Sequence, residues 1–329
     1  MRPSRRLAVF CALMLTGTLA GCSAQERSAG TLPPLTAPDS APTGATLPTS
    51  DCAAEPTEPD ERPYDAMAGV DDQLLSLDVY PLPDECGTRP ALVWVHAGKW
   101  TGGDKRTRVE PVAKLAAANG WVLISVNYRL AGDGTGVQWP EPGDDVASAI
   151  ADIVEHADEL GIDPSQLALI GVAEGGHIAT MVAVDPSLLA TADLARSDVA
   201  CLATLDVNSF DLVRSTGADD AEMAEVFGDE FADLQAASPA AVLGQLANDP
   251  AAAQAAGDLA DMVIVSRGAT QERAIDDDFA RLAREAGAEV TVVDASTYTA
   301  AEVDAAIGDP TDTLVYPALV TFLHGCLDD

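Results

Sequence analysis

The sequence predicts an α/β fold, built on a mostly parallel, doubly wound sheet with helices on both faces. Three observations predict it. Short apolar runs of strand length alternate with amphipathic helical segments over residues 64–329. One of these runs, Leu167–Gly171, passes through a glycine-rich turn directly into a helical segment. The chain of 329 residues is also long enough to bury one large core.

The individual elements follow from hydrophobic periodicity and from the residues that end each segment. Strands are expected at residues 74–80, 91–96, 121–127, 167–171, 199–206, 262–266 and 290–293. Helices are expected at residues 107–119, 144–160, 271–286 and 313–326, with Gly120 as the C-terminal cap of the first. Residues 209–256, which are rich in Ala and Asp, are predicted to form a small helical cap insertion.

The turn after Leu167–Gly171 has an unusual centre. Gly171 and Gly175 lie two residues before and two residues after Ala173. This spacing is typical of a sharp strand-to-helix turn whose central residue has a strained backbone and whose neighbours must be small. The residue at this centre, Ala173, carries only a methyl group.

Four motifs in order resemble the esterase/lipase branch of the α/β-hydrolases, in its feruloyl-esterase-like form with an H-G-G-G-W-x-x-G-D-K loop. The resemblance covers roughly residues 64–327 and implies an α/β-hydrolase fold. The motifs are His96-Ala97-Gly98-Lys99-Trp100 with Gly103-Asp104-Lys105, then Val126–Leu130, then Trp139-Pro140, Asp145 and Gly161–Pro164, and last the turn at Ala173.

The resemblance also implies where a catalytic triad would lie. Ala173 stands at the Ser position of the G-x-S-x-G nucleophile elbow, Gln271 at the acid position and Ala300 at the His position, while Glu272 is one residue away from the acid position. All three positions are predicted to be vestigial. The vestigial oxyanion loop and cleft would consist of His96, Ala97, Gly98, Lys99, Trp100 and Glu174, with Lys99 as a bulky, charged entrance.

The histidine content supports the loss of the base. The chain has four histidines, and none lies between residues 294 and 308, where the base is expected. His96 belongs to the oxyanion loop, His156 is expected on an exposed helix face, His177 is expected to pack or cap, and His324 is expected at the wrong end of the sheet.

These observations predict a catalytically inactive, carboxylesterase-like protein that acts by binding a small molecule or a protein in the old cleft. One alternative is a hydrolase with a non-standard active site that uses Glu174 or His177, although Glu174 is one residue past the apex and its side chain is expected to point elsewhere. Another alternative is a scaffold that uses only its surface. No cofactor is expected, and no Cys–His spacing suggests a metal site.

The N-terminus predicts export and anchoring. Residues 1–6 are basic, residues 7–19 are apolar but too short to span a bilayer, and Leu19-Ala20-Gly21-Cys22 resembles the lipobox of bacterial lipoproteins. Residues 1–21 would then be a signal peptide, and a lipid on Cys22 would hold the protein at the extracytoplasmic face of the bacterial cell membrane. An ordinary secretory signal with a chance Cys is the alternative. Residues 22–63, rich in Pro, Thr, Ser and Ala, are predicted to be a disordered tether.

Four cysteines would remain once Cys11 leaves with the signal peptide and Cys22 carries the lipid. In an oxidising compartment three pairings are possible, or some thiols stay free and buried. We favour Cys52–Cys86, which would pin the end of the tether, and Cys201–Cys326, which would link a central strand to the last helix.

The formal charge of −35 excludes one class of partner. Nucleic-acid binding needs clustered Lys and Arg on the phosphates, so a nucleic-acid partner is not expected. The acidity is typical of a solvated surface that keeps a protein soluble, and an acid-adapted or cation-binding role is the alternative.

Overall fold

The computed structural model describes residue 47 and residues 50–132, 134–215 and 221–327. The predicted signal peptide, Cys22 and most of the predicted tether lie outside these ranges. Within the described ranges, no helix combines the length and the apolar character that crossing a bilayer requires.

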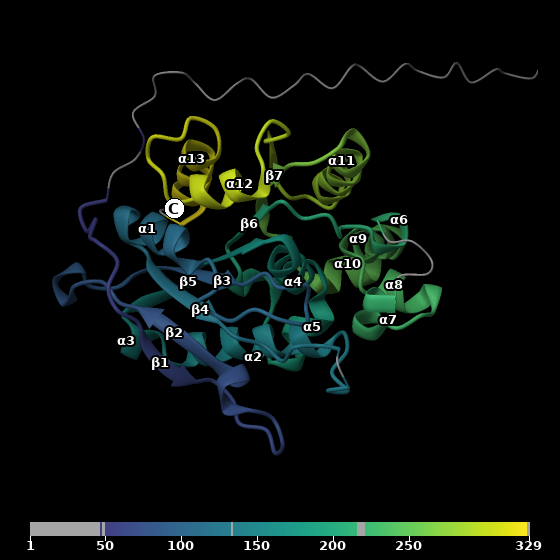
Figure 1. The fold of residues 1–329 in the computed structure, drawn as a ribbon, viewed down its shortest axis with the longest axis horizontal. Helices are drawn as coiled ribbons and strands as arrows, with labels where there is room; N and C mark the ends of the chain where they lie inside the picture. Colours follow the sequence, from purple (N-terminus) through teal and green to yellow (C-terminus); the bar gives the residue numbers. More distant parts are fainter. Residues whose placement is uncertain (1–46, 48–49, 133, 216–220, 328–329) are drawn as a thin grey trace, which may run out of the picture. The chain divides into compact units, whose positions relative to one another are not determined.

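An eight-stranded sheet forms the centre of the domain, in the order β1-β2-β4-β3-β5-β6-β7-β8 (Figure 1). Strands β3 to β8 run parallel to one another, whereas β2 is antiparallel to both of its neighbours, β1 and β4. The predicted mostly parallel sheet is therefore confirmed. The strand bounds are β1 Asp60–Pro63, β2 Ser76–Tyr80, β3 Arg89–Val95, β4 Val122–Val126, β5 Ile162–Val172, β6 Cys201–Leu205, β7 Asp261–Ser266 and β8 Val290–Asp294.

Helices cover both faces of the sheet, as the alternation of strands and helices predicts. The helices α1 (Val109–Asn119), α12 (Ala300–Ala306) and α13 (Val315–Leu327) pack on one face (Figure 1). The other face is covered by α2 (Glu141–Glu155), α3 (Ala157–Leu160), α4 (Ala173–Val184), α5 (Pro186–Thr191) and α11 (Thr270–Glu285). The fold class is therefore confirmed on both sides of the sheet.

Alternating residues of the central strands supply the two hydrophobic cores. In β3, Leu92 and Trp94 pack with the α1, α12 and α13 face, while Val93 and Val95 pack with the opposite face. All four side chains are almost completely buried. Because neither face of the central strands meets water, these strands read in the sequence as continuous apolar runs rather than as alternating ones.

The predicted cap insertion is helical. It contains α6 (Leu212–Ser215), α7 (Ala221–Phe227), α8 (Phe231–Ala236), α9 (Pro239–Asn248) and α10 (Pro250–Ala256). Figure 1 shows these short helices together, beside α4 and α11. The cap therefore lies between β6 and β7 in the chain, and its Ala237 contacts His177 near the start of α4.

Among the differences from the sequence prediction are two in the N-terminal half of the chain. Strand β1 lies inside the expected tether, where Asp60–Pro63 pair with β2 through Ser76–Val79. Its polar residues have no apolar alternation, because an exposed edge strand needs no buried face, and the sequence pattern therefore missed it. The expected helix 144–160 is divided at His156, which ends α2 and precedes α3.

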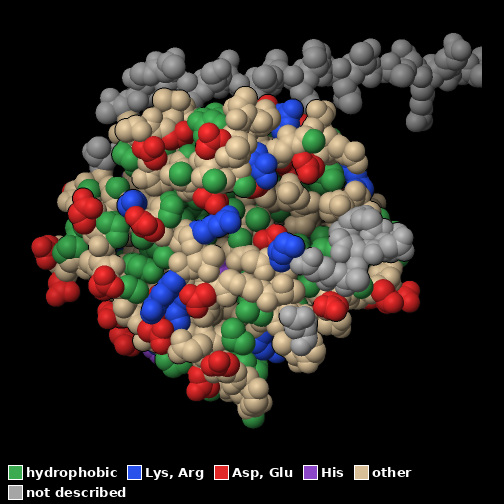
Figure 2. Space-filling model, viewed as in Figure 1, with side chains coloured by type: hydrophobic (Ala, Val, Ile, Leu, Met, Phe, Trp, Pro, Cys, Tyr) green, Lys and Arg blue, Asp and Glu red, His purple; other side chains and the backbone are tan. Residues whose placement is uncertain are grey.

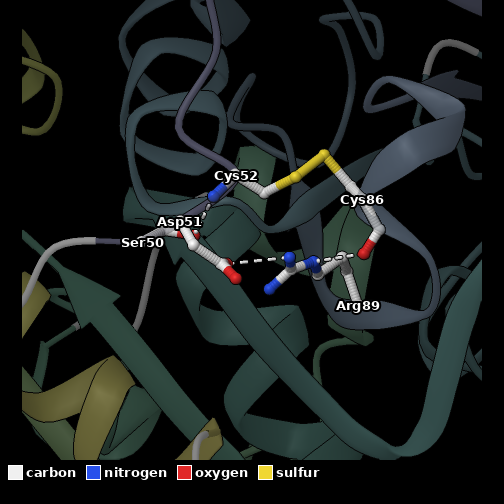
Figure 3. The surroundings of a disulfide bond; sticks show 5 residues. All are labelled: Ser50, Asp51, Cys52, Cys86 and Arg89. Atoms are coloured by element: carbon white, nitrogen blue, oxygen red, sulfur yellow. Dashed lines mark hydrogen bonds and ion pairs between the residues drawn. A yellow bond between two sulfur atoms is a disulfide. The ribbon is translucent and has the colours of Figure 1, made fainter.

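Both favoured disulfides are present and confirm the predicted pairing. Cys52–Cys86 joins the segment before β1 to the short turn of 3₁₀ helix at Asp84–Cys86 (Figure 3). Beside it, the Arg89 guanidinium donates to the Cys86 carbonyl oxygen at 2.9 Å and pairs with Asp51 at 2.8 Å. Cys201–Cys326 links β6 to α13. The chain that leads into the sheet is thus fastened at residue 52.

The Gly103-Asp104-Lys105 motif forms a buried polar junction rather than part of a cleft. The Lys105 side chain is almost fully buried and pairs with Glu61 at 3.1 Å and Asp78 at 3.5 Å. The Lys105 amide donates to Asn127 at 2.6 Å. This junction links β1, β2 and the end of β4. The motif therefore contributes to the stability of the fold.

Candidate functional site

The turn between β5 and α4 has the strained geometry that its glycines predict. Ala173 is the first residue of α4 and adopts φ = 50° in the left-handed region, where an L-residue with a side chain is disfavoured. A Cβ on Gly171 would lie 2.6 Å from backbone atoms of Gly175 and Gly176. A Cβ on Gly175 would collide with the carbonyl oxygens of Val95 and His96. The elbow therefore has the strained backbone conformation although its central side chain is only a methyl group.

The loop after β3 lies beside this elbow. Gly98, Lys99 and Trp100 all have positive φ, at 148°, 57° and 59°. The Gly98 carbonyl accepts a hydrogen bond from the Gly102 amide at 2.8 Å, which closes the loop. His96 is fully buried, and its ring stacks on Tyr128 at 4.3 Å between centroids. Burial lowers the pKa of His96, so its ring is neutral and structural.

Glu174 occupies the space between the loop and the elbow. Its Oε2 accepts a hydrogen bond from the Gly98 amide at 3.2 Å, and its side chain lines the same cavity as Ala173. The expectation that the Glu174 side chain points elsewhere was therefore wrong. The first turn of α4 places position 174 toward the preceding loop, and the Gly98 N–H offers the carboxylate a donor. The Gly98 amide is thus already hydrogen-bonded to the Glu174 carboxylate at the elbow.

His177 joins three parts of the structure through both ring nitrogens. Its Nδ1 accepts from the Trp100 indole N–H at 3.2 Å, so the proton is on Nε2, which donates to the Ala237 carbonyl oxygen at 2.8 Å. The ring is fully buried, and burial lowers its pKa to about 4. The prediction that His177 packs or caps is confirmed, and it ties the loop and the cap to α4.

The two remaining histidines lie away from the elbow. His156 is partly exposed at the end of α2 and contacts Asp152. His324 on α13 bonds Asn119 at 3.0 Å and packs against Trp121, which precedes β4. That contact is at the amino ends of the parallel strands, whereas Ala173 follows the carboxyl end of β5. The expected placement of His324 is confirmed.

Of the predicted acid and base positions, the first lines the cavity and the second does not. Gln271 on α11 lines the cavity together with Ala173. Glu272 also lines it, but its carboxylate accepts from the Ala269 amide at 2.6 Å and caps α11. Ala300 begins α12 and does not line the cavity. Lys99 is exposed and is not among the described residues that line the cavity.

One charged pair near the elbow was missed by sequence reasoning. Asp206 follows β6 with φ = 54°, is about 94% buried and meets Arg267 after β7, with Oδ1 and Nε 2.7 Å apart. Burial raises the pKa of Asp206, and the Arg267 guanidinium opposes that shift. The available signal was its place at the carboxyl end of a predicted strand, where sites of parallel sheets lie.

A cavity of about 440 Å³ joins these groups. Ala173, Glu174, Asp206 and Gln271 line one part of it, and Arg214 and Met223 of the cap line another. Its volume is in the range of small-molecule sites. Among the residues that the structure describes, no three His, Cys, Asp or Glu side chains are grouped as a metal site requires.

Sequence comparisons place the loop and the elbow in a known family. The BD-FAE family model matches residues 77–210. LipM of Mycobacterium tuberculosis, a probable carboxylic ester hydrolase, is 35% identical over 113 residues, which cover 34% of this chain and 26% of LipM. Ethyl acetate hydrolase of Pseudomonas putida is 33% identical over 135 residues, 40% of this chain and 41% of the relative. The chain thus spans between a quarter and about two fifths of these curated relatives.

Solved structures resemble the chain over a longer range. The apo form of Thermogutta terrifontis esterase 2 has a TM-score of 0.62 at 23% identity and covers 82% of this chain and 93% of its own. Carboxyl esterase 2 of Tuber melanosporum has a TM-score of 0.63 at 16% identity, with 85% and 90% covered. These likenesses show the α/β-hydrolase fold. Together with the family model that matches the loop and the elbow, they support the resemblance of the chain to the esterase/lipase family of α/β-hydrolases.

Proposed function

We propose that this protein is a catalytically inactive member of its family that binds a ligand in the former active-site cleft. One observation carries the proposal: the elbow presents the methyl group of Ala173 where an attacking oxygen would be needed. A methyl group cannot attack a carbonyl carbon, and no covalent acyl intermediate can form on it. The strained backbone at Ala173 persists without the chemistry that would make use of it.

The contact between Glu174 and Gly98 supports the same conclusion. Acyl transfer builds negative charge on an oxygen beside the elbow, and N–H donors aimed at that oxygen stabilise it. Here the Gly98 amide already donates to a carboxylate, 3.2 Å away. A second negative charge beside Glu174 would be repelled rather than stabilised.

The histidines add a third line of support. A general base must reach the attacking group and be free to accept its proton. His177, the histidine nearest to the elbow in sequence, already uses Nδ1 and Nε2 in hydrogen bonds to Trp100 and Ala237. The buried ring of His96 is stacked on Tyr128. We therefore extend the proposal to the base: no histidine of the chain serves at Ala173.

The N-terminal sequence completes the proposed role. A lipid on Cys22 would anchor the domain at the extracytoplasmic face of a bacterial cell membrane, with the residues that follow as a tether. The two disulfides of the domain fit an oxidising compartment. Mass spectrometry of the membrane fraction should detect a lipidated N-terminal peptide that begins at Cys22, and a Cys22→Ala variant should lose membrane attachment.

The Ala173→Ser variant tests the catalytic part. We expect the purified variant neither to hydrolyse p-nitrophenyl butyrate nor to be labelled by a fluorophosphonate, because the new hydroxyl would have no base and a carboxylate would hold Gly98. Circular dichroism and the melting temperature check that the variant is folded. Stoichiometric phosphonylation of Ser at position 173 in the folded variant would contradict the proposal.

The alternative, a hydrolase that uses Glu174 as a carboxylate nucleophile, has one supporting observation, because Glu174 lines the cavity. Its prediction is distinct. Any ester turnover by the wild-type protein would disappear in Glu174→Gln, and an acylated Glu174 would be trapped by rapid quenching. Unchanged turnover in Glu174→Gln would end this alternative.

A further inference from the structure

The cavity beside the elbow has an uneven charge balance. Among the residues that the structure describes, the carboxylates of Glu174, Asp206 and Glu272 line it, against the guanidinium of Arg214. Arg214 already pairs with Asp278 at 2.6 Å and lies 3.9 Å from Asp211, both outside the cavity wall. Its positive charge is therefore not available to balance the carboxylates that line the cavity.

Two of the three carboxylates that line the cavity each have a partner of their own. Asp206 meets Arg267 at 2.7 Å, and Glu272 accepts from the Ala269 amide as the cap of α11. Glu174 makes no ion pair with any described Lys or Arg. Within the described part of the chain, its side chain accepts one hydrogen bond, from the Gly98 amide. One N–H dipole does not neutralise a full charge, so Glu174 leaves an unbalanced negative charge at the cavity wall.

Glu174 is also held in place and has capacity left. The Gly98 amide contacts Oε2, which leaves Oε1 without a hydrogen bond to the described residues. The side chain is only partly buried, so Oε1 can meet a ligand. A carboxylate positioned before binding loses little conformational freedom when it forms a new ion pair.

The neighbouring wall is aromatic and apolar. Trp100 lines the cavity, as do Met223, Leu212 and Ile275. The Trp100 indole is fixed by its hydrogen bond to His177 and by edge packing against Phe227 at 4.9 Å between centroids. An aromatic ring near a carboxylate is the combination that recognises organic ammonium groups, through cation–π attraction and charge pairing.

We propose that the cavity binds an organic cation, with its ammonium group paired to Glu174 and its apolar part against the Trp100 wall. This inference rests on the proposed binding role of the cavity and adds the chemical class of the ligand. The net charge of −35, with Asp and Glu side chains spread over the face drawn in Figure 2, supports it further, because a strongly negative protein attracts cations and repels carboxylates.

Isothermal titration at constant ionic strength tests this with three probes of similar size: benzyltrimethylammonium, benzyl alcohol and benzoate. We expect the ammonium probe to bind most tightly and benzoate to bind least. In Glu174→Gln, which keeps the size and the acceptor for Gly98, the affinity for benzyltrimethylammonium should fall by about tenfold or more. The control Glu110→Gln removes the same charge from the exposed surface of α1, and its affinity should match that of the wild type.

Three results would overturn the inference: no binding of benzyltrimethylammonium, equal or tighter binding of benzyl alcohol or benzoate, or an unchanged affinity in Glu174→Gln. Binding of benzyl alcohol or benzoate would leave the proposed binding role standing and remove only the preference for cations. Ester turnover by the same preparation, lost in a cavity variant, would instead contradict the proposed function, so the two failures are distinguishable.

Discussion

The Glu174 carboxylate accepts a hydrogen bond from the Gly98 amide at 3.2 Å, across the gap between the first turn of α4 and the loop after β3. In an active hydrolase of this fold, donors in this region serve an oxyanion that forms during the reaction. Here the chain supplies its own anion. The contact unites the proposed loss of catalysis with the proposed selection of cations, because the same charge opposes an oxyanion and attracts an ammonium group.

The strain at Ala173 predicts that glycine stabilises the elbow. We expect Ala173→Gly to raise the free energy of unfolding by about 0.5 kcal/mol, since relief of a left-handed cost of about 1–2 kcal/mol exceeds the added unfolded-chain entropy of about 0.4–1 kcal/mol. Ala179→Gly is the matched control in the same helix: it is buried at ordinary φ and should lower the stability by about 1 kcal/mol or more. Urea denaturation measures both, and equal losses in the two variants would refute strain at the elbow.

The hydrogen bonds of His177 predict a structural rather than a catalytic role. His177→Ala should lower the free energy of unfolding by about 3 kcal/mol, because it opens a cavity and leaves the Trp100 N–H and the Ala237 carbonyl without a partner. His156→Ala, at a partly exposed site, should change the stability little. A His177→Ala variant as stable as the wild type would show that the contact between the loop and the cap contributes nothing.

The buried polar junction at Lys105 predicts a large loss of stability when the side chain loses its charge. Lys105→Met should lower the free energy of unfolding by about 3 kcal/mol, since it leaves the fully buried Asp78 with Arg106 as its remaining cationic partner. The matched control is Lys114→Met on the exposed face of α1, which should leave the stability unchanged within error. Equal effects of the two substitutions would show that burial at Lys105 carries no energetic weight.

Asp276 predicts an unusual pH dependence of stability. Burial raises its pKa to about 7, opposed by the Ser266 hydroxyl that donates to it at 2.5 Å. Between its unfolded pKa of about 4 and pH 7, the folded state holds a proton that the unfolded state has released, so this contribution to stability is complete below pH 4 and is lost as the pH rises through 7.

Asp276→Asn removes that proton linkage. The stability of the variant relative to the wild type should therefore increase between pH 4 and pH 8, by up to about 4 kcal/mol. Denaturation of both proteins at several pH values measures the difference, in which the titration of all other groups cancels. A difference that stays constant, or falls, over this range would contradict the raised pKa.

The fold could be predicted because its signals are local. The apolar runs of β3 to β7 and the glycines around Ala173 each reflect a burial or a close approach that the chain itself must satisfy. Strand β1 was not predicted because Asp60–Pro63 form an exposed edge and bury no apolar face. The break at His156 was not predicted because the apolar spacing continues across it, although the backbone of His156, at φ −104° and ψ 18°, interrupts the helix.

The site was harder to predict because its contacts join residues that are distant in the sequence. Gly98 and Glu174 are 76 residues apart, and the pair of Asp206 and Arg267 spans two strand ends. Position alone placed Glu174 one residue past the apex, and only the path of the loop after β3 reveals what its side chain reaches. His177 could be predicted as a packing residue, but its partner Ala237 comes from a cap whose position no local pattern specifies.

Ester hydrolysis by the purified wild-type protein tests the central claim most directly. The release of p-nitrophenol from acetyl and butyryl esters should equal the rate in buffer, and Glu174→Gln and Asp206→Asn should give that same rate. Turnover well above buffer that follows the protein through purification, and that one of these cavity substitutions abolishes, would contradict the account and show that the site is an active esterase.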